Sequence, residues 1–178
     1  MMREMFVTFA KYNREANQSI VSILKDLSQE EREKDRGSFY KSLSGLLAHV
    51  LGGTVFFLRM FKAAVSHNAA AVEALAPLDA IVIPRDRLSG DQWNQFAADV
   101  AAADDALVNF TTALTDADMK APVTLEWYGG NPPSVPLAFM LQQLTVHGTH
   151  HRGQISQILD ALSITNDYSG INVTFLSP

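Results

Sequence analysis

The sequence predicts an all-α protein built as a bundle of four helices. Apolar side chains recur at steps of three and four residues in four separate segments, and turn-forming residues separate these segments. Only one short stretch favours extended structure. A chain of 178 residues suits one domain that can bury a sizeable core. We therefore expect residues 1–178 to form a single bundle domain.

The first helix is expected over about residues 6–27, before charged and turn-forming residues interrupt the periodicity at 28–37. The second is expected from about Ser38 to Ala64, with Ser38 as its N-cap. Its apolar arc is wide, which predicts burial on more than one side. The region from Ala76 to Gly90 then reads as a connector.

The third helix is expected to begin at the sequence SGDQ, residues 89–92, because this is a capping-box pattern. Between Pro122 and Pro136 we expect a short β-hairpin or an ordered loop, whose segment 126–128 either covers the bundle end or packs on the surface. The fourth helix is expected from about Val135 to Leu162, with Pro136 in its first turn. The tail after residue 162, with apolar Ile171, Val173, Phe175 and Leu176, is expected to dock on the bundle.

The composition excludes several kinds of site and partner. The chain has no Cys, so disulfides, thiolate zinc sites and Cys nucleophiles are excluded. Its net charge is -5 and its Lys and Arg residues are scattered, so we expect no nucleic-acid partner. The longest apolar run, Val50–Met60, is shorter than the roughly 18 residues of a membrane span, and no signal peptide is recognisable. We expect a cytoplasmic protein without a membrane partner.

Three histidines are the candidate metal ligands. His147 and His151 are four residues apart, so on a helix they lie on one face, one turn above the other. A third ligand must come from another helix, and His49 is the natural choice because it lies well inside the second helix among small residues. His150 lies about 100° round the helix from His151 and fits a ligand role less well. An accidental pair of partly buried histidines is the alternative interpretation.

Three neutral imidazoles favour zinc, nickel, copper or iron over magnesium and calcium. Three protein ligands also leave coordination positions open, which is typical of a catalytic site. A water or thiol held at such a position loses its proton more readily than in bulk solvent.

Further polar residues fall on the apolar stripes of the predicted helices. Asn13 and Asn17 are expected to find hydrogen-bond partners in the core, or else to support a ligand histidine. Asp104 either orients a histidine, acts as a general base, or lies at the solvent edge, which is the preferred expectation. Arg152 could pair with an acid or an anionic substrate. His150, Asp104 and Arg152 are the weaker catalytic candidates.

The block from His147 to Gln154, HGTHHRGQ, resembles the last-helix signature of the DinB/YfiT-like metalloenzyme family. Tyr12, Asn13 and Asn17 resemble the opening of that family, and the block from Ser38 to His49 resembles its second helix. The resemblance implies an up-down-down-up bundle with a long crossover between the second and third helices. It also implies a zinc or nickel site at His49, His147 and His151, and a homodimer. Some relatives transfer low-molecular-weight thiols such as bacillithiol, or use mycothiol in an isomerase reaction.

The first functional hypothesis is therefore a metal-dependent thiol S-transferase or small-molecule hydrolase. The second is a non-catalytic, stress-related dimeric module that only binds metal. The third is an inert bundle whose histidine cluster is a coincidence.

Overall fold

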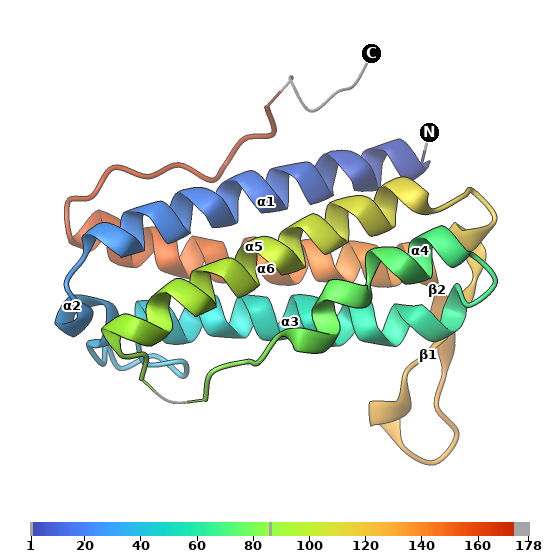
Figure 1. Ribbon diagram of the computed structural model, residues 1–178, viewed down its shortest axis with the longest axis horizontal. Coiled ribbons are helices and arrows are strands. Elements are labelled where there is room, and N and C mark those ends of the chain that lie inside the picture. The colour runs from blue at the N-terminus through green and yellow to red at the C-terminus, as the bar shows by residue number, and fades with distance from the viewer. Residues whose placement is uncertain (1, 86, 173–178) are drawn as a thin grey trace.

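The computed structural model describes residues 2–85 and 87–172, and it is mostly helical with a small two-stranded sheet. Four helices of 22 residues or more lie side by side (Figure 1). They are α1 (Met2–Asp26), α3 (Leu43–Ala64), α5 (Gly90–Ala113) and α6 (Leu137–Ala161). The shorter helical segments are α2 (Gln29–Glu33), α4 (Ala69–Ala74), η1 (Ala76–Ala80), η2 (Asp118–Lys120) and η3 (Glu126–Tyr128). The all-α prediction agrees with this content.

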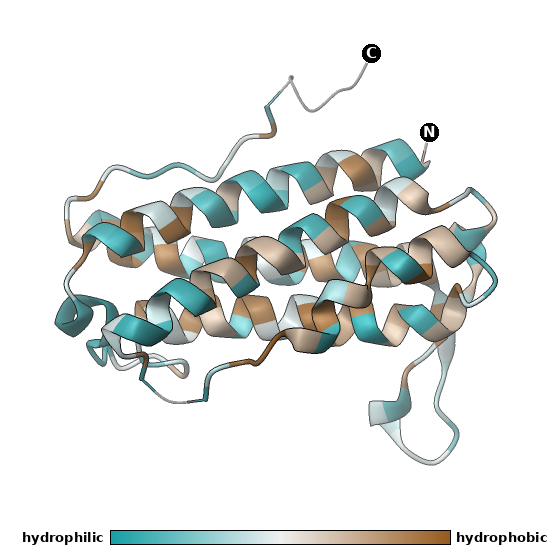
Figure 2. Ribbon diagram, viewed as in Figure 1, coloured by the Kyte–Doolittle hydropathy of each residue, from teal (hydrophilic) through white to brown (hydrophobic). Residues whose placement is uncertain are grey.

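The apolar stripes of the long helices face one another and form the core (Figure 2). Helix α1 packs mainly on α5, and α3 packs mainly on α6. Phe61 of α3 and Phe110 of α5 are fully buried and stack with their ring centroids 6.1 Å apart. Burial of such rings contributes strongly to stability. The core thus holds α3 against both α5 and α6.

Helix α3 begins later than predicted, and this changes which residue caps it. Ser42 is the N-cap, and its Oγ accepts a hydrogen bond of 3.0 Å from the backbone N–H of Gly45. The prediction of Ser38 as N-cap was wrong, because residues 38–41 form a tight turn in which Lys41 has a φ of 63°. This positive φ is incompatible with a continuing helix. The turn places Tyr40 beside the first turns of α3.

The capping box before α5 is confirmed, with Ser89 and Gln92 bonding reciprocally. The predicted hairpin is also present, as strand β1 (Pro122–Thr124) paired antiparallel with β2 (Ser134–Pro136). Helix α6 begins at Leu137, so the predicted start at Val135 was wrong. Val135 is extended because it pairs with Val123, and Pro136 precedes the helix as its N-cap.

The tail docks on the bundle over part of its length. The hydroxyl of Tyr12 donates a hydrogen bond to the carbonyl of Tyr168, and the side chains of Ile164 and Tyr168 pack against the core. Ile171 is exposed, and Val173, Phe175 and Leu176 lie outside the described residues. The docking prediction is thus confirmed for the first part of the tail.

Helix α3 is the one described helix that is long and apolar enough, by length and composition, to cross a membrane. This corrects the expectation that no segment reaches that length. Within its most apolar window 56% of the helix is buried inside the protein, because α3 is a core helix packed on α5 and α6. The absence of a membrane partner stays a prediction.

We predict that Ser42→Ala lowers the free energy of unfolding by about 1 kcal/mol, because it removes the acceptor for an N-terminal N–H of α3. Ser38→Ala, four residues upstream, is the matched control and should change it by much less. Chemical denaturation of both variants measures this. A larger loss of stability in Ser38→Ala than in Ser42→Ala would indicate that Ser38 is the N-cap.

Candidate metal centre

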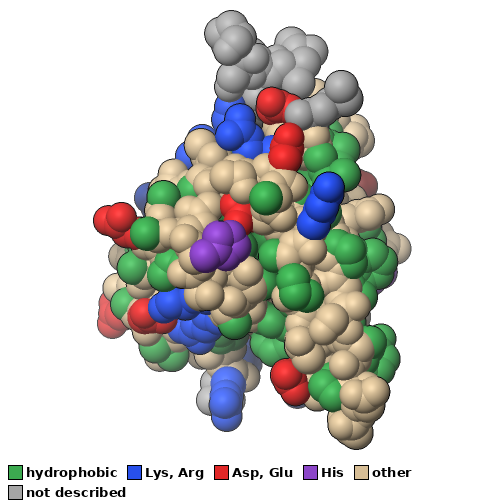
Figure 3. Space-filling view, turned by 90° about the vertical axis from the view of Figure 1, so that its right-hand side faces the viewer, with side chains coloured by type: hydrophobic (Ala, Val, Ile, Leu, Met, Phe, Trp, Pro, Cys, Tyr) green, Lys and Arg blue, Asp and Glu red, His purple; other side chains and the backbone are tan. Residues whose placement is uncertain are grey.

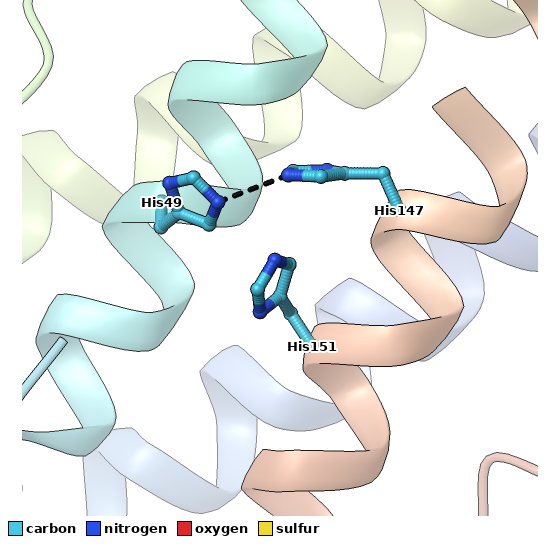
Figure 4. Close-up of side chains that lie close together, drawn as sticks. All are labelled: His49, His147 and His151. Carbon is cyan, nitrogen blue, oxygen red and sulfur yellow. Dashed lines mark hydrogen bonds between the residues drawn. The ribbon is translucent and has the colours of Figure 1, made fainter. Parts of the chain in front are cut away.

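The three predicted ligands meet between α3 and α6 (Figure 4). His49 projects from α3, and His147 and His151 project from successive turns of α6. One ring nitrogen from each lies within 4.8 Å of the other two. The Nε2 atoms of His49 and His147 are 3.0 Å apart. The structure therefore brings together all three residues that the sequence singled out as ligands.

Gly53 makes room for this arrangement. A Cβ atom at residue 53 would lie 2.5 Å from Cε1 of His147, closer than nonbonded carbon atoms approach. Because residue 53 has no side chain, the His147 ring can lie directly against the backbone of α3. A small residue at this place in α3 is thus a condition for the cluster.

The surroundings of all three imidazoles favour the neutral form. Burial lowers the pKa of His147 to about 4, and the neighbouring His151 and His49 add to the shift. Burial also lowers the pKa of His49 and of His151. Protonating one ring would place a positive charge against two others in a partly buried site. Neutral imidazoles are the form that binds metal.

The geometry of the cluster fits a metal ion. Two nitrogens bound tetrahedrally at about 2.0–2.1 Å from zinc are roughly 3.3 Å apart, close to the spacing of His49 and His147. The Nδ1–H of His151 donates to Oε1 of Gln154 at 2.7 Å, which leaves Nε2 of His151 as the nitrogen with a lone pair. The donor set of three imidazoles suits a divalent transition metal.

Tyr40 is a residue of this site that the sequence did not reveal. Its hydroxyl oxygen lies 2.8 Å from Nε2 of His49, and its ring stacks on the His49 ring with centroids 3.9 Å apart. The turn that carries it can close because Gly45 has no side chain: a Cβ there would lie 2.1 Å from the Tyr40 carbonyl oxygen. Neither contact has a spacing signal in the sequence, since both depend on the turn at 38–41.

A groove of about 810 Å³ opens beside the cluster. Its walls come from α2, the turn at 38–42, the first half of α3 and the connector at 83–88, and His49 and Tyr40 form part of them. Of the three histidines, His49 lines this groove, so a small molecule bound there would lie next to the His49 ring. The centre is therefore accessible from one side.

Asp104 belongs to a separate buried polar cluster. It is 1% exposed, so the expectation of a solvent-edge position was wrong. Asn13 and Asn17 of α1 face it across the helix interface, and their Nδ2 groups donate to its Oδ1 at 2.7 and 2.9 Å. Burial raises the pKa of Asp104 to about 8, against the lowering effect of the Asn17 hydrogen bond and the Arg152 charge. The two amides thus serve the core and bond no histidine.

Arg152 completes that cluster from α6. It is 1% exposed, it donates to Oδ1 of Asn13 at 2.6 Å, and its guanidinium lies 5.1 Å from the Tyr12 ring centroid. Its described hydrogen bonds go to Asn13 and Asn17 of α1 and to Thr149 of its own helix, and none goes to a ligand histidine. His150 is exposed, although its ring centroid is 4.8 Å from that of His151. Of the three weaker catalytic candidates, only His150 touches a ligand histidine.

A helical protein with a three-histidine cluster beside an open groove is the class that this fold and site define. The model of the DinB family matches residues 1–166, and the chain belongs to that family. Comparisons with curated proteins and with solved structures gave no match.

We predict that Gly53→Ala weakens metal binding at least about tenfold, the scale seen when groups that support metal ligands are changed. The new methyl group would displace the His147 ring. Gly52→Ala is the matched control, because its Cβ would meet Ile83 at an ordinary 3.4 Å. Metal titration of both variants, with circular dichroism to verify folding, measures the difference. Equal affinities would show that Gly53 does not control the site.

We predict that the stability of the metal-free protein falls as the pH drops from about 6.5 toward 4. In this window the unfolded chain protonates its histidine at residue 147, whereas burial keeps the folded one neutral. The unfolded state then binds more protons, so acid favours it. His147→Gln, which cannot be protonated, should flatten the decline in denaturation curves recorded across this range. If the unfolding free energy of His147→Gln falls with pH as steeply as that of the wild type, His147 is not the group responsible.

Proposed function

We propose that this protein is a metal-dependent enzyme that binds one divalent transition-metal ion through His49, His147 and His151, with zinc or nickel as the ion. Its reaction would be the transfer of a low-molecular-weight thiol or the hydrolysis of a small molecule. The observation that carries the proposal is a cluster of three imidazoles, one of which, His49, lines a groove of about 810 Å³. Three protein ligands leave room for a substrate.

When bound, the metal would lower the pKa of a thiol or water that it holds. The chain supplies the other parts. Gln154 holds His151 in the orientation that turns Nε2 toward the cluster. Tyr40 bonds Nε2 of His49, and this bond would be given up when that nitrogen binds metal. The freed hydroxyl could then donate a hydrogen bond to a substrate in the groove.

Tyr40 also supports the alternative, a metal-binding module without catalysis. Its hydroxyl is close enough to His49 to become a fourth ligand, and a site closed by four protein ligands is typically structural. Tyr40→Phe separates the two proposals. A structural site would bind metal more weakly in this variant, whereas an open site would keep its affinity and lose turnover.

The finer architecture also belongs to the proposal. We infer the up-down-down-up order of helices and a cytoplasmic homodimer. The proposed dimer is supported by exposed aromatic residues where the hairpin meets α3: Phe56 and Trp127 are about half exposed, with ring centroids 5.8 Å apart. Hydrophobic side chains gather on this end of the molecule (Figure 3). The hairpin residues thus pack on the surface of α3, and they are not part of the groove at His49.

We predict one metal ion per chain in protein purified without a histidine tag, and loss of that metal in His147→Ala, because two imidazoles hold an ion poorly. His150→Ala is the matched control, since its side chain is exposed on the same helix and should leave the metal content unchanged. Elemental analysis measures both. Metal-free wild-type protein, after growth with zinc and nickel supplied, would favour the inert bundle.

Turnover of a model electrophile separates the two reactions. A thiol transferase needs both metal and thiol, and a hydrolase needs metal alone. Equal turnover with and without thiol would exclude the proposal that the protein is a thiol transferase.

A further inference from the structure

The groove beside the candidate metal centre is lined by a buried acid, and one oxygen of this acid has no partner among the described residues. Glu33, at the end of α2, is only 6% exposed and lines the groove. Its Oε1 is buried without a hydrogen-bond partner among the described residues. A buried polar oxygen without a partner is unfavourable. A group from outside the chain would remove that penalty.

A second buried oxygen without a partner belongs to another residue that lines the groove. Ser44, in the first turn of α3, is 2% exposed, and its Oγ is likewise buried without a partner. It lies one helical turn plus one residue before His49 in the sequence, and both residues line the groove. A carboxylate and a hydroxyl together suit a ligand group with several N–H donors. An ammonium group has three.

The backbone around Glu33 is held in place. Arg87 donates to the Glu33 carbonyl at 2.9 Å, and the preceding Arg32 donates to the carbonyl of Leu24 at 3.1 Å. The Arg32 guanidinium also lies 4.6 Å from the Trp93 ring centroid. These contacts fix α2 against the bundle, so Glu33 stays at the wall of the groove.

The other charges of the groove indicate what else the ligand carries. Four basic side chains border it, together with three acidic ones that include Glu33. The basic ones are Lys34, Lys41, Arg85 and Arg87. They would repel a ligand with positive charge alone and attract an anionic group. A zwitterion therefore fits the groove better than a simple cation does.

We propose that Glu33 and Ser44 form a subsite for the ammonium group of a small zwitterionic substrate whose other end reaches the metal centre. This deepens the proposed function, and it rests on that function for the metal-bound end of the ligand. Two observations carry this proposal: the buried oxygens of Glu33 and Ser44 that have no partner, and the groove that both residues line together with His49.

The test uses metal-loaded protein and three thiols, read by isothermal titration calorimetry. L-Cysteinylglycine carries an ammonium and a carboxylate, N-(3-mercaptopropionyl)glycine lacks the ammonium, and L-cysteinylglycinamide lacks the carboxylate. We expect the dipeptide to bind at least about tenfold more tightly than the compound without the ammonium, the scale of a hydrogen bond to a charged group. The amide should also bind more weakly than the dipeptide. Equal affinities for the amide and the dipeptide would overturn the proposal that the ligand is a zwitterion.

Two variants assign the effect to Glu33. Glu33→Gln should reduce the preference for the ammonium-bearing compound to less than about twofold, whereas Glu15→Gln, on the exposed face of α1, should preserve it. Ligand-free Glu33→Gln should melt at or above the wild-type temperature, because Oε1 of Glu33 makes no hydrogen bond that the substitution would break. A lower melting temperature would show a structural role and overturn the proposal.

Metal content measured on the same samples distinguishes the two proposals. Full metal occupancy with equal binding of the ammonium-bearing and ammonium-free compounds would remove the subsite and leave the metal centre intact. Protein that takes up no metal but still prefers the ammonium-bearing compound would remove the metal centre and leave the subsite intact.

Discussion

The close packing of α3 against α6 is the contact on which the candidate site depends. His49 and His147 are 98 residues apart in the chain, and they meet because these two helices share a buried face. The absence of a side chain at Gly53 sets how near the His147 ring can come to α3. The burial that lowers the pKa of all three imidazoles depends on this interface, and so does the position of His49 at the wall of the groove.

Local sequence patterns were sufficient for much of the architecture. The capping box at Ser89, the hairpin near Val123 and the pairing of His147 with His151 on one helical face all depend on residues that are close in sequence. His49 required one further step, because a histidine inside a buried helix needs a partner. These features were predictable because short-range geometry determines them.

Tertiary contacts determined what the sequence could not reveal. The start of α3 depends on a turn with positive φ at Lys41, which propensity does not favour for this residue type. The burial of Asp104 depends on two amides of α1 that face it across a helix interface. Tyr40 and Glu33 lie at the groove only because α2 and the following turn fold back on α3. None of these arrangements has a periodic signature.

The polar cluster of Asn13, Asn17, Asp104 and Arg152 joins α1, α5 and α6. It anchors the very turn of α6 that carries His151. The helix is thus oriented without an ion, and little conformational entropy would remain to be lost if the three histidines bound a metal. Such a rigid cage would select ions by size and coordination preference, and it could exchange one metal for another while the fold stays unchanged.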